Sequence, residues 1–113
     1  VCTSHFFIQI LVGSLEDNGL GGWYSYRGSK AALNMMLKCA ALELCRLNSS
    51  AKLLAYHPGT VDTPLSKPFQ GSVDPKTLLS PERAAEALDT VLAEVEPDGE
   101  LSYLDWRGEA IPW

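Results

Sequence analysis

The sequence predicts an α/β fold with about three parallel strands and two main helices. Short apolar runs alternate with two segments of helical periodicity, in the order strand, helix, strand, helix, strand. The 113 residues, 46% hydrophobic and 20% charged, suit a single soluble globular domain. Because right-handed crossovers connect strands that are separated by helices, the three strands should be parallel.

The first two elements are an apolar strand and a long helix. Residues 6–12 predict the strand, which ends near Ser14, and residues 16–22 predict a loop because glycine and acidic residues dominate them. A helix is expected over Tyr24–Leu47, since its apolar residues recur at three- and four-residue steps: Leu33, Met36, Leu37, Ala40, Ala41, Leu44 and Leu47.

The remaining elements follow a short buried strand at Lys52–His57. Residues 58–81 hold five of the seven prolines and are expected to be irregular. Ser80 as N-cap and Pro81 in the first turn predict a second helix over Pro81–Val95. A third strand is expected over Glu100–Asp105.

Tyr26 and Lys30 are the most informative pair in the chain. On a helix, residues i and i+4 lie on one face with their Cβ atoms about 5 to 6 Å apart. A nearby ammonium favours the phenolate, which lowers a phenol pKa from about 10 toward the working pH of an acid–base catalyst. Without further motifs, the pair is weak evidence, because a tyrosine and a lysine at this spacing are more often surface residues of a helix.

The set formed by Ser14, the run Tyr26–Asn34, and Pro58-Gly59-x-Val61-x-Thr63 resembles the short-chain dehydrogenase/reductase family. The sequences of residues 22–35 and of residues 111–113 are most similar to those of its C-factor-like members. This resemblance implies the C-terminal half of a Rossmann-like, doubly wound parallel sheet, with these strands as the last three of seven. It also implies a cytoplasmic oxidoreductase that transfers hydride between a carbonyl or alcohol substrate and NAD or NADP.

The resemblance implies specific roles for the matched residues. Tyr26 would be the proton donor or acceptor, Lys30 would lower the Tyr26 pKa and bind the nicotinamide ribose, and Ser14 would hold the substrate oxygen. Both Tyr26 and Lys30 thus lie at the cofactor as well. Four residues would line the nicotinamide and its phosphates: Pro58, Gly59, Val61 and Thr63.

Two family features are not found in residues 1–113: the glycine-rich phosphate loop and the catalytic Asn before the serine strand. We therefore expect a single partial domain over residues 1–113 that lacks the dinucleotide-binding half and is inactive alone. The parent is expected to be a homo-oligomer. A non-catalytic interaction or signalling module, with the long helix as subunit contact, remains the alternative.

Charge and composition disfavour other classes of function. The net charge is −5, and residues 82–113 carry nine acidic against two basic groups, so nucleic-acid binding is not expected. Residues 6–12 are too few to span a membrane. Three cysteines give no disulfide framework, and Cys39 and Cys45 point about 120° apart on the predicted helix. His5 and His57 lack the spacing of a metal site.

Overall fold

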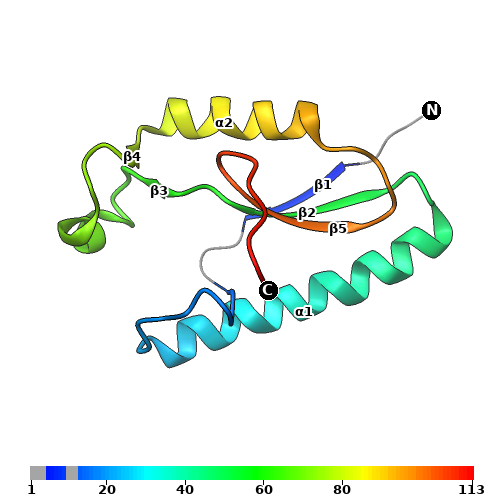
Figure 1. The fold of residues 1–113 in the computed structure, drawn as a ribbon, viewed down its shortest axis with the longest axis horizontal. Coiled ribbons are helices and arrows are strands. Elements are labelled where there is room, and N and C mark those ends of the chain that lie inside the picture. Colours follow the sequence, from blue (N-terminus) through cyan, green and yellow to red (C-terminus); the bar gives the residue numbers. More distant parts are fainter. Residues whose placement is uncertain (1–4, 10–12) are drawn as a thin grey trace.

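A computed structural model describes residues 5–9 and 13–113, and its centre is a parallel three-stranded sheet. The strands β1 (His5–Gln9), β2 (Lys52–His57) and β5 (Leu101–Asp105) lie in the order β1-β2-β5. Helices α1 (Tyr24–Leu47) and α2 (Pro81–Glu94) cover opposite faces of this sheet (Figure 1). The predicted α/β fold is confirmed.

The central strand β2 is buried on both faces, which explains its continuous apolar sequence. Leu53 and Ala55 join the core beneath α1, together with residues of α1 and β5: Leu37, Ala41 and Tyr103. Leu54 and Tyr56 point the other way and pack with Val91 of α2. Side chains that alternate between the faces of a strand therefore divide the core into two layers.

Both helices begin close to the predicted residues, but their first turns differ. Ser80 Oγ accepts a hydrogen bond from Arg83 N at 3.2 Å, which confirms Ser80 as the N-cap of α2. The N-cap of α1 is Trp23, whose φ of 57° lies in the left-handed region and whose side chain makes no capping hydrogen bond. A bulky residue rarely adopts this conformation outside constrained sites.

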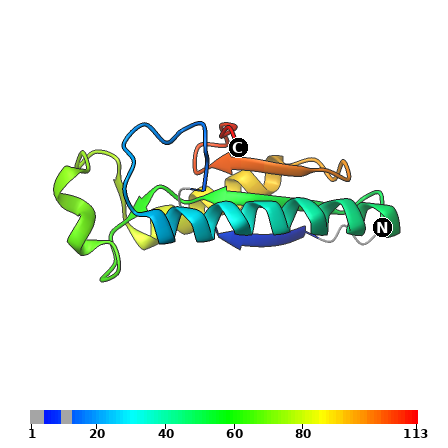
Figure 2. The same ribbon diagram turned by 90° about the horizontal axis from the view of Figure 1, so that it is seen from below.

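The proline-rich segment is more ordered than the sequence indicates. It contains the short parallel strands β3 (Thr60–Val61) and β4 (Leu78–Leu79) and the 3₁₀ helix η1 (Lys67–Ser72). Figure 2 shows this segment beyond one end of the sheet, beside the start of α1. Strands of two residues carry too little hydrophobic periodicity to be recognised in a sequence.

The third strand is slightly shorter than expected, and the first can be compared with its prediction only in part. The prediction for residues 6–12 is met by β1 up to Gln9, and residues 10–12 lie outside the described part of the chain. The third strand begins at Leu101 rather than Glu100. Cys39 and Cys45 are both free thiols. Among the described residues, neither helix combines the length and apolar character needed to cross a membrane.

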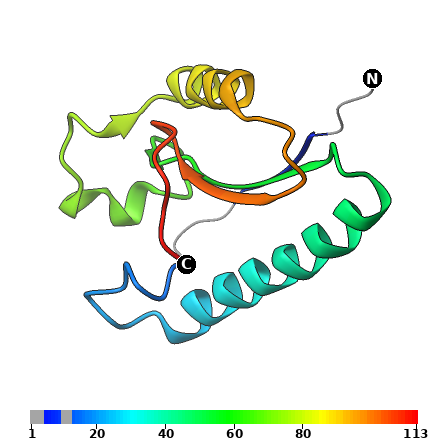
Figure 3. The same cartoon turned by 45° about the vertical axis from the view of Figure 1, so that its right-hand side comes forward.

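The last residues fold back along β5 and approach the loop after β1 (Figure 3). Ile111 N donates to Tyr103 O at 2.9 Å, and Ala110 forms an antiparallel bridge with Leu104. The Trp113 ring packs on Tyr103, with centroids 5.0 Å apart, and Trp113 O accepts from Glu16 N at 3.2 Å. The tail thereby contacts the loop that contains Ser14.

Candidate active site

Tyr26 and Lys30 lie on the same face of α1, in its first two turns. The Lys30 ammonium nitrogen is 5.6 Å from the centre of the Tyr26 ring. Tyr26 is 39% exposed and Lys30 is partly buried, so the phenol remains accessible while the ammonium stays beside it. This placement permits the proton transfer that the sequence predicts, and the catalytic roles themselves stay predictions.

Ser14 lies in the loop after β1 and is buried, with only 6% of its surface exposed. Its Oγ accepts a hydrogen bond from Asp17 N at 3.1 Å, and a hydroxyl in this position still has its proton to donate. The preceding residue, Gly13, packs against α1 so closely that a Cβ there would be 2.8 Å from Lys30 O. The Ser14 loop and the Lys30 turn are therefore neighbours.

The segment from Pro58 to Thr63 leaves the carboxyl end of β2, next to the carboxyl end of β1. Pro58 and Gly59 are buried, and Gly59 has a φ of 74° that favours glycine. Val61 pairs with Leu79 between β3 and β4. Ligands of open α/β sheets bind at this edge, so the predicted cofactor segment lies where the fold allows a cofactor.

Ser66 organises the end of this segment. Its Oγ donates to the Val61 carbonyl oxygen and accepts from Thr63 N at 3.2 Å. Thr63 O in turn accepts from Ser66 N and Lys67 N, each at 3.1 Å. Val61 is thus held both by its pairing in β3 and by the Ser66 hydroxyl, and Thr63 is held by the Ser66 hydroxyl and by the turn that follows it.

Trp23 adjoins Tyr26 and connects it to Phe69, and neither of these aromatic contacts was found from the sequence. Trp23 makes edge-to-face contacts with Tyr26, at 6.2 Å between centroids, and with Phe69 of η1, at 4.9 Å. These contacts connect the start of α1 to the proline-rich segment. The left-handed backbone of Trp23 cannot be predicted from its residue type. Its contact with Phe69 joins residues far apart in the chain, so no local sequence pattern indicates it.

Asn34 and Tyr103 form a buried polar pair below the Ser14 loop, which sequence reasoning also missed. Asn34 follows Lys30 by one turn on α1 and is 6% exposed. Burial raises the pKa of the Tyr103 phenol, while the Gly13 backbone and the Asn34 side chain beside its oxygen oppose that rise. A polar residue between Leu33 and Leu37 was the available signal.

A second polar group lies at the carboxyl ends of β2 and β5. His57 and Asp105 line a hollow of about 260 Å³ with Asp17, Arg107 and residues of the tail. Burial lowers the pKa of His57, against the opposing effect of Asp105 and Asp17. The neutral imidazole is therefore favoured, and its Nδ1 is buried without a hydrogen-bond partner among the described residues.

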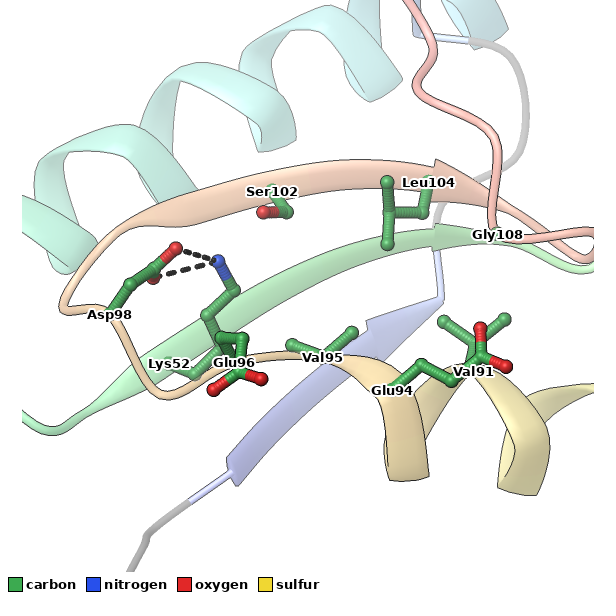
Figure 4. Close-up of a pocket in the computed structure, with 9 residues that line it drawn as sticks. All are labelled: Lys52, Val91, Glu94, Val95, Glu96, Asp98, Ser102, Leu104 and Gly108. Carbon is green, nitrogen blue, oxygen red and sulfur yellow. Dashed lines mark hydrogen bonds and ion pairs between the residues drawn. The ribbon is translucent and has the colours of Figure 1, made fainter.

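Another hollow, of about 270 Å³, lies between the end of α2 and β5 and contains no predicted site residue (Figure 4). The Lys52 side chain is 3% exposed, and its ammonium contacts both carboxylate oxygens of Asp98 at 2.8 and 3.1 Å. This ion pair satisfies the buried lysine and joins the start of β2 to the turn before β5. It is a structural contact.

No protein-family model matches the chain, but individual proteins do. A 1-hydroxy-2-glutathionyl-2-methyl-3-butene dehydrogenase from Rhodococcus is 38% identical over 90% of this chain, and C-signal from Myxococcus xanthus is 34% identical over 90%. A short-chain dehydrogenase/reductase from Burkholderia multivorans, solved with bound NADP, matches 95% of this chain with 31% identity and a TM-score of 0.72.

The chain belongs to the short-chain dehydrogenase/reductase family. Its similarity to C-signal agrees with the C-factor-like sequence of residues 22–35. The chain spans 43% of the Rhodococcus dehydrogenase, 56% of C-signal and 44% of the Burkholderia protein. In this family member, Ser14, Tyr26 and Lys30 lie around adjoining turns of α1 and the end of β1.

Proposed function

We propose that these residues carry the proton-transfer site of an NAD(P)-dependent oxidoreductase that interconverts a carbonyl and an alcohol. The observation that carries the proposal is the Lys30 ammonium 5.6 Å from the Tyr26 ring centre. Reductases and dehydrogenases among the relatives, one of them solved with NADP, support it. The chain spans only part of the length of these relatives. This supports an active site that is incomplete without the other part of the protein.

The residues fit a nicotinamide cofactor. The turn that contains Gly59 lies at the carboxyl end of β2, and no carboxylate among the described residues pairs with Lys30. Its ammonium can therefore donate to ribose hydroxyls, and the Val61 and Thr63 backbone can line the nicotinamide. When bound, the cofactor would donate a hydride to the carbonyl carbon or accept one from the alcohol.

The side chains of this site perform the accompanying proton transfer. In reduction, Tyr26 gives its phenolic proton to the substrate oxygen, and in oxidation the phenolate takes it back. Lys30 stabilises the phenolate electrostatically. Ser14 donates its hydroxyl proton in a hydrogen bond to the substrate oxygen, where negative charge develops during reduction, and such donors contribute a few kcal/mol to transition-state stabilisation, on the order of 3.

Tyr26→Phe tests the proton-donor assignment. In the protein encoded by the complete reading frame, we expect carbonyl reduction, followed as NADPH oxidation, to fall about a hundredfold or more. Tyr24→Phe is the matched control, because Tyr24 is 88% exposed and has Gly28 rather than a lysine one turn later. Undiminished reduction by Tyr26→Phe would refute the assignment.

Cofactor titration separates catalysis from the interaction-module alternative. We expect the complete protein to bind NADPH or NADH, and Lys30→Met to weaken that binding, because Lys30 would contact the ribose. The chain of residues 1–113 is expected to bind either cofactor weakly or not at all. A complete protein that binds neither cofactor would favour the interaction module.

A further inference from the structure

We propose that Asn34 is a positioning residue that fixes the Ser14 loop against α1, an inference that rests on the proposed function. Asn34 has no assigned role in the proton transfer. It lies one turn beyond Lys30, so Tyr26, Lys30 and Asn34 follow one another at four-residue steps along the same face of the helix.

Asn34 is a buried amide whose own hydrogen bonds are incomplete. It is 6% exposed, and neither Nδ2 nor Oδ1 has a hydrogen-bond partner of good geometry among the described residues. A buried, unsatisfied amide destabilises the fold, so an apolar side chain of similar size would suit this core position better. The presence of an amide here needs a reason other than stability.

The contact of Asn34 with Gly13 explains why an amide stands at this position. A Cβ at position 13 would be 2.7 Å from Asn34 Nδ2 and 2.8 Å from Lys30 O. The backbone just before Ser14 therefore rests on the Asn34 amide and on the helix turn of Lys30. A side chain of different shape or polarity at position 34 changes this contact, and a shift of Gly13 displaces Ser14 as well.

Tyr103 completes the contact from the sheet. Its side chain is 4% exposed and lies in the core beneath α1. The Asn34 side chain and the Gly13 backbone are near enough to the phenol oxygen to oppose the effect of burial on its pKa. Asn34 is thus the point where the loop after β1, helix α1 and strand β5 meet.

The consequence for catalysis is geometric. Ser14 comes from a loop, whereas Tyr26 and Lys30 come from a helix, and Ser14 and Tyr26 must act on one substrate oxygen while Lys30 stays beside Tyr26. A displacement of about 1 Å in such a group can reduce the rate about a hundredfold. Asn34 would influence the reaction through Ser14 without touching substrate or cofactor.

Asn34→Leu separates positioning from stability. We expect the melting temperature to stay the same or rise, while hydrogen exchange of the Asp17 amide, which donates to Ser14 Oγ, becomes at least about tenfold faster. In the complete protein, kcat should fall about tenfold or more and the KM for the cofactor should change less than about twofold. Tyr103→Phe, which removes only the phenol oxygen, should act in the same direction with a smaller effect.

Leu37→Val is the matched control, because Leu37 is buried on the same helix but lies in the apolar core. It should lower the melting temperature without changing Asp17 exchange or kcat. The proposal is overturned if Asn34→Leu leaves Asp17 exchange and kcat unchanged, or if its losses merely follow a fall in melting temperature, as core truncation would. If the unmodified protein reduces no carbonyl compound, the proposed function fails, and Asp17 exchange still decides whether Asn34 positions the loop.

Discussion

Gly59 lies so close to Trp106 that a Cβ at position 59 would stand 2.8 Å from the indole Cδ1. Its φ of 74° is also unfavourable for any residue with a side chain. The turn after β2 therefore requires glycine at position 59 for two reasons, the backbone conformation and the close approach of Trp106. This turn carries the segment that we assign to the cofactor.

We predict that Gly59→Ala destabilises the protein by about 1–3 kcal/mol and weakens cofactor binding. Urea unfolding measures the first effect and NADPH titration the second. Gly71→Ala is the control, since a Cβ at Gly71 in η1 meets no atom within 4 Å. Equal stability of the Gly59 and Gly71 variants would contradict the strain argument.

Gly28 is expected to show the opposite effect. It lies within α1, between Tyr26 and Lys30, and a Cβ there would meet no atom within 4 Å. Glycine in a helix interior is about 1 kcal/mol less favourable than alanine. Gly28→Ala should therefore raise the free energy of unfolding by up to about 1 kcal/mol, and an unchanged or lower value in urea unfolding would refute this.

Asp105 should make stability depend on acid pH. Burial raises the pKa of its carboxyl, but four hydrogen bonds, from the Arg107 side chain and from Arg107 N and Glu109 N, outweigh burial and lower the pKa overall. The folded state therefore binds this proton less tightly. The stabilisation is complete above the unfolded pKa of about 3.9 and is lost as the pH falls through the lower folded value.

Asp105→Asn should accordingly destabilise the protein by about 1–3 kcal/mol near neutral pH and have less effect near pH 3. Urea unfolding at both pH values checks this difference. Asp89→Asn, at an exposed position of α2, is the control and should change little. A destabilisation by Asp105→Asn that is the same at both pH values would argue against the carboxylate as its source.

The sequence predicts the elements with strong periodicity and misses those set by contacts between distant residues. Helix α1 begins and ends where its apolar spacing indicates, and Ser80 with Pro81 defines the start of α2. By contrast, the β3–β4 pairing depends on residues far apart in the chain. The contact of Gly13 with Asn34 and the aromatic contact of Trp23 with Phe69 likewise have no local pattern.

The candidate site likewise contains residues whose positions the sequence predicts and residues whose positions it does not predict. Tyr26 and Lys30 are one helical turn apart, so their spacing alone predicts a shared face, and the structure places them on it. The distance from Ser14 to Tyr26 along the chain is set by a loop, so its position could be expected only from the family resemblance. The polar Asn34 interrupts an apolar pattern, but its contact could not be predicted, because its partner Gly13 has no side chain.

The surface of the isolated chain predicts self-association. Strand β1 is at one end of the sheet order, and α1 exposes large apolar side chains, with Met35 65%, Met36 60% and Leu42 52% exposed. Sheet edges and contiguous apolar surfaces both favour association between copies. We expect residues 1–113 to elute above 12.3 kDa in size exclusion with light scattering and to unfold over a broad denaturant range.

Met36→Lys should reduce this association, because a charge among the exposed apolar side chains of α1 opposes their burial between two copies. Leu20→Lys is the matched control: Leu20 is 94% exposed, but it lies in the loop before α1 and should leave the elution unchanged. If both variants act alike, the contact does not involve α1. A monodisperse 12.3 kDa species with a sharp, cooperative unfolding transition would show that the sheet edge and the helix surface are tolerated in water.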